Sequence, residues 1–113
     1  MSTIFEKIIN KEILSEIVYE TDSVLAFKDI NPIAPVHILI IPKKNISTMN
    51  DINKNDSEVL SELFLSAKRI AKKVGIAKDG YRVVINCNEN GGQTVYHLHL
   101  QLIGGRKLGW PPG

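Results

Sequence analysis

One stretch near the C-terminus constrains the fold more than any other, namely Val95–Arg106, which reads VYHLHLQLIGGR. Polar and apolar residues alternate along it, which is typical of a half-buried β-strand because successive side chains point to opposite faces. Tyr96 and three leucines share one predicted face. His97, His99 and Gln101 share the other, with neighbouring groups roughly 6–7 Å apart. The sequence therefore predicts a rigid strand that presents two imidazoles and one amide to a single pocket.

Composition places the chain among globular proteins and excludes several partners. Of its 113 residues, 43% are hydrophobic and 23% are charged, which predicts one domain, 1–113, with one core. A net charge of +2 is too small to indicate nucleic acid or a membrane as partner. No apolar run approaches the roughly 18 residues of a membrane span. The single cysteine excludes an internal disulfide and fits a reducing compartment, so we expect a cytoplasmic or nuclear protein.

Hydrophobic periodicity elsewhere predicts an α+β fold with an antiparallel sheet of about five strands. A short N-terminal helix and one long helix accompany the sheet, and the long helix should cover one sheet face with an apolar stripe at helical spacing. Pro35 and Pro42 bound an almost wholly apolar run that should form a central strand covered on both faces. The predicted helices are 3–9 and 56–74, and the predicted strands are 16–20, 23–27, 36–41, 81–86 and the histidine strand within 95–106.

Capping residues mark the ends of both predicted helices. Ser2 or Thr3 can cap the short helix. Asn55 or Asp56 can cap the long one, with Glu58 three residues after Asn55 as in a capping box.

The histidine face permits two kinds of chemistry. An imidazole nucleophile beside backbone N–H donors of the loop 91–94 suits attack on phosphorus, because glycines let the backbone approach a ligand. Zinc is the competing interpretation, with His97, His99 and His37 as ligands. Gln101 is a poor zinc ligand, and no second cysteine or acidic partner lies nearby in sequence. The residues favour phosphate chemistry, so we expect no metal and no cofactor.

The segment Gln93–Arg106 resembles the signature of the histidine triad (HIT) nucleotide-binding family, His-φ-His-φ-His-φ-φ, where φ is apolar. The likeness extends upstream to 25–30, 32–37 and 41–44. The C-terminal Trp110-Pro111-Pro112-Gly113 resembles the Hint branch of that family. The resemblance implies a HIT-like fold, a homodimer, and binding of a purine nucleotide such as AMP or GMP.

The resemblance also implies residue roles. His99 matches the nucleophile that forms a nucleotidyl-histidine intermediate, His97 the residue that orients it, and His37 a residue of the same relay. Val95 and Gln101 match further nucleotide contacts. The remaining matched positions are Phe27, Asp29 and Ile30 for base and ribose, and Asn86, Gly92, Gln93 and Thr94 for the α-phosphate.

One position departs from the family pattern, because Gln101 stands where the third histidine belongs. Hydrolysis of nucleoside 5′-phosphoramidates at the P–N bond is the function that the resemblance implies. An amine leaving group needs a proton, and a glutamine side chain supplies none. A nucleotidyltransferase-like activity, or a nucleotide-binding adaptor with weak activity, therefore stays open beside the hydrolase.

Overall fold

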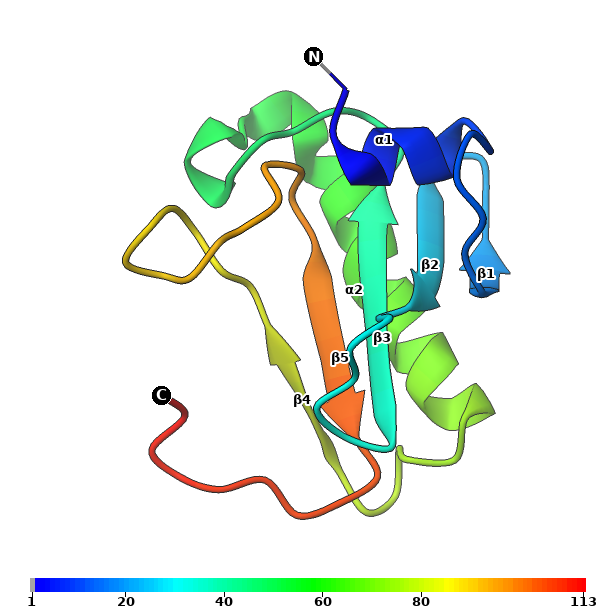
Figure 1. Cartoon of the computed structure of the whole chain (residues 1–113), viewed down its shortest axis with the longest axis vertical. Helices are drawn as coiled ribbons and strands as arrows, with labels where there is room; N and C mark the ends of the chain where they lie inside the picture. Colours follow the sequence, from blue (N-terminus) through cyan, green and yellow to red (C-terminus); the bar gives the residue numbers. More distant parts are fainter. Residues whose placement is uncertain (1) are drawn as a thin grey trace.

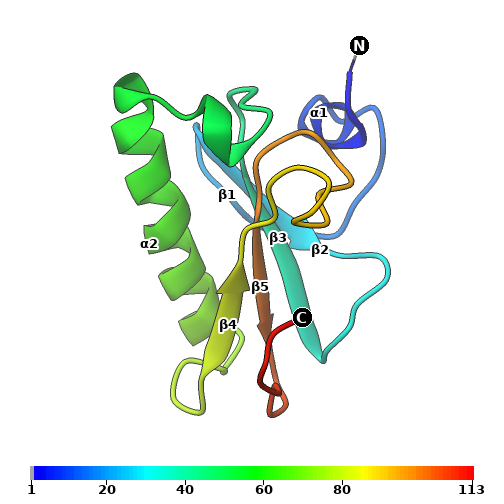
Figure 2. The same ribbon diagram turned by 90° about the vertical axis from the view of Figure 1, so that its left-hand side faces the viewer.

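A five-stranded antiparallel sheet forms the centre of the structure, a computed structural model that describes residues 2–113. Helix α2 covers one face of the sheet, and the short helix α1 lies across one end of the other face (Figures 1 and 2). The strand order is β1-β2-β3-β5-β4, so β1 and β4 are the edges. The predicted α+β architecture is confirmed. The elements are α1 (Ile4–Ile9), β1 (Ile17–Glu20), β2 (Val24–Lys28), β3 (Val36–Pro42), α2 (Ser57–Lys73), β4 (Tyr81–Val84) and β5 (Leu100–Gly104), with 3₁₀ turns at Met49–Asp51 and Lys54–Asp56.

Strand β3 is central, as its apolar run predicts, and it pairs with β2 and β5. Its residues alternate between two hydrophobic layers because successive side chains point to opposite faces. Ile38 and Ile40 pack toward α2, whereas Leu39 and Ile41 pack on the opposite face. The active-site candidates in the sheet lie on this second face.

Helix α2 buries the apolar stripe that its spacing predicts. Leu63, Ala67, Ile70 and Ala71 are all buried against the sheet, and Lys72 and Lys73 follow in the last turn. Burial of such a stripe stabilises a helix more than intrinsic propensity does. Within residues 2–113, none of the helices combines the length and the apolar character that a bilayer span requires.

Helix α1 closes the opposite layer. Thr3, one of the two predicted caps, caps this helix in a complete capping box. The Glu6 N–H donates to the Thr3 hydroxyl oxygen, and the Thr3 N–H donates to the Glu6 carboxylate. Phe5 and Ile8 are buried against Leu25 and Phe27. The N-terminal helix therefore reaches the sheet face that carries His99.

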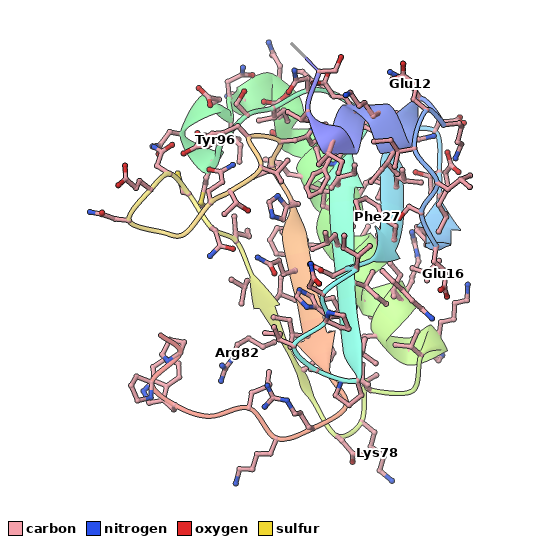
Figure 3. All side chains as sticks on the ribbon, in the orientation of Figure 1. Glu12, Glu16, Phe27, Lys78, Arg82 and Tyr96 are labelled. Atoms are coloured by element: carbon pink, nitrogen blue, oxygen red, sulfur yellow. The ribbon has the colours of Figure 1, made fainter. Side chains whose placement is uncertain are left out.

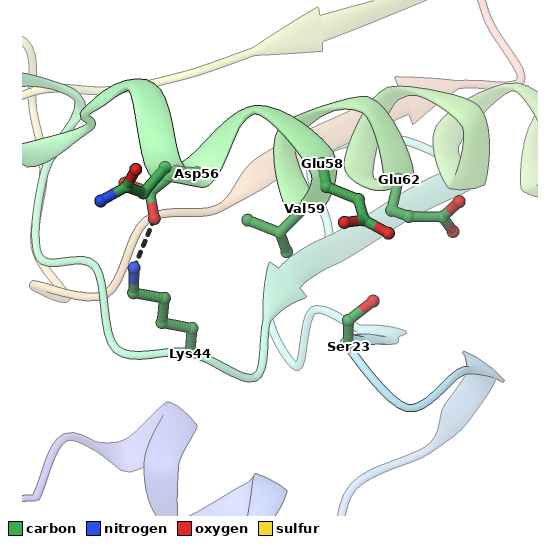
Figure 4. Close-up of a pocket in the computed structure, with 7 residues that line it drawn as sticks. Ser23, Lys44, Asp56, Glu58, Val59 and Glu62 are labelled. Atoms are coloured by element: carbon green, nitrogen blue, oxygen red, sulfur yellow. Dashed lines mark hydrogen bonds and ion pairs between the residues drawn. The ribbon is translucent and has the colours of Figure 1, made fainter.

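Asp56 is the N-cap residue of α2, which confirms one of the two predicted caps, but its side chain makes no capping hydrogen bond to α2. A capping box closes the 3₁₀ turn that precedes α2, and its partners are Asn53 and Asp56 in place of the predicted Asn55 and Glu58. The Asp56 carboxylate is buried and forms an ion pair with Lys44, whose Nζ lies 2.5 Å from it (Figure 4). Hydrogen bonding by Lys44 lowers the pKa of Asp56, with a further contribution from the Asn53 backbone.

The predicted histidine strand begins later than its alternation indicates. Strand β5 starts at Leu100, and Val95–His99 is irregular. The β3 register, with Ile40 opposite Leu100, brings Pro42 opposite Leu98. Pro42 has no N–H to donate, and its carbonyl oxygen accepts from the His97 ring, so the ladder ends there. The Leu98 N–H donates instead to the Ile46 carbonyl oxygen, 2.6 Å away.

The alternation is correspondingly incomplete. Leu98, Leu100 and Leu102 are buried as predicted, but the Tyr96 side chain is 43% exposed, which corrects its predicted inward position.

Candidate active site

A cavity of about 540 Å³ lies between α1 and the sheet face opposite α2. Its volume falls within the range of small-molecule sites, about 300–1,000 Å³. Seven of the residues predicted from the sequence line it, from elements far apart in the chain: Phe27, Asp29, Ile30, Thr94, Val95, His99 and Gln101.

His99 is held in one tautomer. Its Nδ1 lies 2.7 Å from the carbonyl oxygen of His97, which can only accept, so Nδ1 carries the proton and donates it. The other nitrogen, Nε2, therefore keeps its lone pair. Burial lowers the pKa of His99, since desolvation outweighs the backbone hydrogen bond that raises it. His99 is thus a neutral imidazole with one basic nitrogen in a cavity wall, which is the state a nucleophile requires.

His97 orients His99 through its backbone and not through its ring. The ring Nε2–H donates to the Pro42 carbonyl oxygen at 2.7 Å, and the side chain is fully buried. Its Nδ1 accepts from no group among residues 2–113. Desolvation also lowers the pKa of His97. The ring therefore anchors the chain just before β5, and the carbonyl that it fixes sets the His99 tautomer.

His37 and Gln101 form a second polar chain. The Ile33 N–H donates to His37 Nδ1 at 3.2 Å, so the proton resides on Nε2, which donates to Gln101 Oε1 at 2.9 Å. Gln101 Nε2 then donates to Asn86 Oδ1 at 2.5 Å, and Asn86 Nδ2 donates to the Gly91 carbonyl oxygen at 2.7 Å. Both ends of the Gln101 amide are thereby fixed. His37 belongs to the site through Gln101.

Asp29 lies at the cavity edge with one oxygen engaged. Its Oδ1 accepts from the Asn31 N–H at 2.8 Å, and its Oδ2 lies 3.5 Å from His37 Nε2. Its carboxylate is about one quarter exposed. It can accept hydrogen bonds from a hydroxylated ligand.

The glycine loop is folded on itself. The Gly92 N–H donates to the Glu89 carbonyl and the Gln93 N–H to the Asn88 carbonyl, both at 3.0 Å. Gln93 is buried, and its side-chain amide donates to the carbonyls of Ser47 and Val95. Neither Gly92 nor Gln93 lines the cavity. Both residues shape the loop that brings Thr94 and Val95 to the cavity wall.

Residues of α1 complete the site, and sequence reasoning assigned them to the core alone. The Phe5 ring meets His99 edge-on, with centroids 5.0 Å apart, and meets Phe27 at 5.4 Å. Figure 3 shows Phe27 between α1 and the sheet. No local pattern links Phe5 to His99, because the contact depends on how α1 packs on the sheet. Further lining residues that the sequence did not indicate are Ile4, Ile8, Ile13, Leu14, Ser15, Asn31 and Leu39.

Two of the three histidines, His37 and His97, are bonded to protein partners. In the part of the chain that the structure describes, no group of three or more histidine, cysteine, aspartate or glutamate side chains is arranged to hold a metal ion. His37 uses both ring nitrogens within the protein, and His97 is turned toward Pro42. The zinc interpretation gains no support from this geometry.

Two of the three buried histidines, His97 and His99, should make stability depend on pH. Their folded pKa values lie below the ordinary 6.5, so the unfolded chain binds more protons as the pH falls below about 6.5. We expect the free energy of unfolding to decrease between pH 7.5 and 5.5, by at most about 1.4 kcal/mol per pH unit for each histidine. Urea denaturation of the wild type and His97→Gln measures this, and an identical slope in both would contradict the assignment to His97.

Comparisons with known proteins place this site in a family. The model of the HIT domain family matches residues 10–108. The purine nucleoside phosphoramidase of Escherichia coli (strain K12) is 53% identical over 107 residues, which are 95% of this chain and 90% of that protein.

Solved structures agree. A HIT family hydrolase from Legionella pneumophila Philadelphia 1 superposes with a TM-score of 0.97 at 51% identity, covering 99% of this chain and all of that one. A HIT family hydrolase from Clostridium thermocellum superposes with a TM-score of 0.93 at 46% identity, covering 96% and 94%.

Proposed function

Because the chain belongs to the HIT domain family, we propose that it binds purine nucleoside monophosphates such as AMP and GMP and hydrolyses nucleoside 5′-phosphoramidates. The name of the Escherichia coli relative, purine nucleoside phosphoramidase, supports the same reaction at 53% identity. The residues proposed to act are the cavity-lining set around His99.

The observation that carries the proposal is the state of His99. Its Nδ1–H is held by the His97 carbonyl, so the lone pair of Nε2 is available within the cavity. Its lowered pKa keeps the ring neutral near pH 7. A neutral, oriented imidazole attacks phosphorus without first losing a proton.

The proposed reaction has two displacements. His99 Nε2 attacks phosphorus, the P–N bond breaks, and the amine leaves with the bonding electron pair and takes up a proton. Water then attacks the nucleotidyl-histidine, releasing the nucleoside monophosphate and restoring the neutral ring. The His97 carbonyl accepts from Nδ1–H throughout and stabilises the positive charge that develops on the ring.

The cavity wall supplies the remaining contacts in this proposal. Phe27 and Ile30 offer apolar surface for a base, and Asp29 offers a carboxylate oxygen for ribose hydroxyls. Thr94 and Val95 face the phosphate position with backbone N–H groups that, within residues 2–113, donate to no other backbone carbonyl. Gly92, Gln93 and Asn86 act by holding that wall and Gln101 in place.

A test combines equilibrium binding with rapid mixing. AMP should bind with a measurable dissociation constant, and adenosine 5′-phosphoramidate should yield AMP through a covalent adduct that mass spectrometry locates on His99. The relative amounts of burst and steady-state AMP report which displacement is slower. Binding of AMP without any release of AMP from the phosphoramidate would contradict the hydrolase and leave a binding protein.

We further propose a homodimer, as the family resemblance implies. Phe64 on α2 is 54% exposed and Tyr96 before β5 is 43% exposed, and both positions fall in the regions that the resemblance assigns to the interface. β4 is an edge strand, with unpaired backbone groups that a second copy can pair. Trp110 is 82% exposed, which suits a tail that packs on a neighbour.

Sedimentation tests the dimer. We expect about twice the monomer mass at micromolar concentration, and a shift toward the monomer in Phe64→Asp, because a carboxylate there would be desolvated in the interface. Lys7→Asp, at an exposed position of α1, is the control and should not shift the equilibrium. A wild-type monomer at micromolar concentration would contradict the proposal.

A further inference from the structure

The loop between β2 and β3, residues 29–35, supplies one side of the active-site cavity and lies on the sheet face opposite α2 (Figures 1 and 2). Three of its residues line the cavity, namely Asp29, Ile30 and Asn31. The Asp29 N–H donates to the His37 carbonyl oxygen at 3.0 Å, but within residues 2–113 no backbone–backbone hydrogen bond involves residues 30–35. A local bond from the Asn31 N–H to Asp29 Oδ1 shapes the first turn. The position of the rest of the loop therefore depends on bonds to side chains outside it.

Both backbone polar groups of Ile33 are bonded to such side chains. The Ile33 N–H donates to His37 Nδ1 at 3.2 Å. The Ile33 carbonyl oxygen accepts from the Arg106 guanidinium, with Nη2 at 3.0 Å and Nε at 3.4 Å. The Ile33 side chain is 59% exposed, so packing of this side chain does not anchor the loop. The loop is thus held at one residue, by His37 on one side and by Arg106 on the other.

Gly105 brings Arg106 close to this loop. Val36 pairs with Gly104, so the sheet register sets Pro35 beside Gly105. The φ angle of Gly105 is +90°, and a Cβ added there would lie 2.8 Å from the Pro35 Cβ. Only glycine permits both this conformation and this close approach of the backbone. The chain after β5 therefore packs directly on the end of the loop, within reach of the guanidinium.

The bonds of Arg106 are to backbone oxygens and not to acidic side chains. Its Nη1 donates to the Lys107 carbonyl oxygen at 3.2 Å, which fixes the guanidinium beside its own chain. Within residues 2–113, it has no carboxylate oxygen within 4.0 Å. Arg106 is exposed, so its replacement uncovers no part of the hydrophobic core. Its main contact outside its own segment is the loop that carries Asp29.

We propose that Arg106 is a positioning residue for nucleoside binding, which holds Asp29 and Ile30 at the cavity through the Ile33 carbonyl oxygen. This inference rests on the proposed binding of purine nucleoside monophosphates. Without Arg106 only the N–H of Ile33 remains bonded, and Asp29 lies four residues away on a loop with no backbone bonds of its own. Hydrogen bonds weaken steeply with distance and angle, so a displaced carboxylate loses the ribose hydroxyls. The nucleophile has a separate support, the His97 carbonyl oxygen.

The test compares AMP with 2′,3′-dideoxy-AMP, which has the same base and phosphate but lacks the ribose hydroxyls. We expect the wild type to bind AMP about tenfold or more tightly, because hydrogen bonds to a carboxylate are among the stronger ones. Arg106→Met has no N–H donor and should lower this ratio to about threefold or less. Arg106→Lys keeps a donor and should retain more of the ratio. Lys107→Met, the control, removes the adjacent positive charge and should leave the ratio unchanged.

Kinetics supply a second readout. Arg106→Met should raise KM for adenosine 5′-phosphoramidate about three- to tenfold and leave kcat within about twofold, because the loop contributes to binding and not to the displacement. A guanidinium that acts only by its charge on the phosphate would weaken both nucleotides equally, and added salt would reduce the loss. That result, or an equal loss in Lys107→Met, would overturn the inference. A fall in kcat with KM unchanged would do the same.

Binding and turnover separate this inference from the proposed function. AMP binding and turnover with an unchanged nucleotide ratio in Arg106→Met would overturn the role of Arg106 and leave the proposed function intact. The expected ratios without release of AMP from the phosphoramidate would support the role of Arg106 and contradict the hydrolase. Absence of AMP binding by the wild type would overturn both proposals.

Discussion

His99→Ala should reduce turnover of adenosine 5′-phosphoramidate by something on the order of 10⁴–10⁶, as removal of a covalent nucleophile does elsewhere. AMP affinity should stay within about tenfold, because the ring bonds to phosphorus mainly along the reaction and not in the ground state. The fold should survive, since His99 Nδ1 bonds only to a local carbonyl. Steady-state release of AMP and calorimetric titration with AMP measure the two effects.

His99→Gly supplies a sharper control for the same prediction. It leaves a space beside Phe5 that free imidazole can enter, because the Phe5 ring packs edge-on against the missing ring. Added imidazole should restore part of the turnover in His99→Gly. It should not accelerate the wild type. Turnover at the wild-type level in His99→Ala would show that another group attacks phosphorus.

Gln101→His should accelerate alkylamine phosphoramidates by about 10²–10⁴, the range of general acid–base catalysis. Gln101 cannot donate a proton to the leaving amine: its Oε1 accepts from His37 Nε2–H, and its amide nitrogen donates to Asn86. A histidine at the same position could exchange a proton with the amine. Adenosine 5′-phosphorofluoridate should respond much less, because fluoride departs unprotonated.

The comparison needs both substrates and a matched variant. Gln101→Asn keeps an amide without adding an acid, and we expect no selective gain with the alkylamine. The competing explanation is that Gln101 serves only as a hydrogen-bond donor and that water delivers the proton. Under that explanation Gln101→His changes the alkylamine and fluoride rates equally, or neither. Selective acceleration of the alkylamine identifies the absent third histidine as the missing acid.

Several features of the fold follow from the sequence alone. The apolar run 36–41 predicts a central strand, and β3 is the third of five. The stripe that includes Leu63, Ala67 and Ile70 predicts the helix that covers one face. These elements depend on short-range periodicity and on burial, so a single segment contains the information. The histidine motif likewise places His99 at a cavity wall.

Long-range contacts decided what the sequence left open. The bond between His97 and Pro42 joins residues 55 apart, and Pro42 ends the β3–β5 ladder before His99, so periodicity alone predicts too long a strand. His97 orients His99 through its carbonyl oxygen, because its ring is already bonded to Pro42.

Tertiary packing also assigned residues whose local sequence shows no chemistry. Phe5 meets His99 only because α1 folds across the sheet. Gln93 belongs to the histidine motif, but its side-chain amide holds the loop in place, because it donates to the carbonyl oxygen of Ser47. The sequence by itself therefore determined the fold class and singled out His99 as the candidate nucleophile. Which atoms face the cavity depended on the register and closure of the whole sheet, because the residues that line it are distant in the chain.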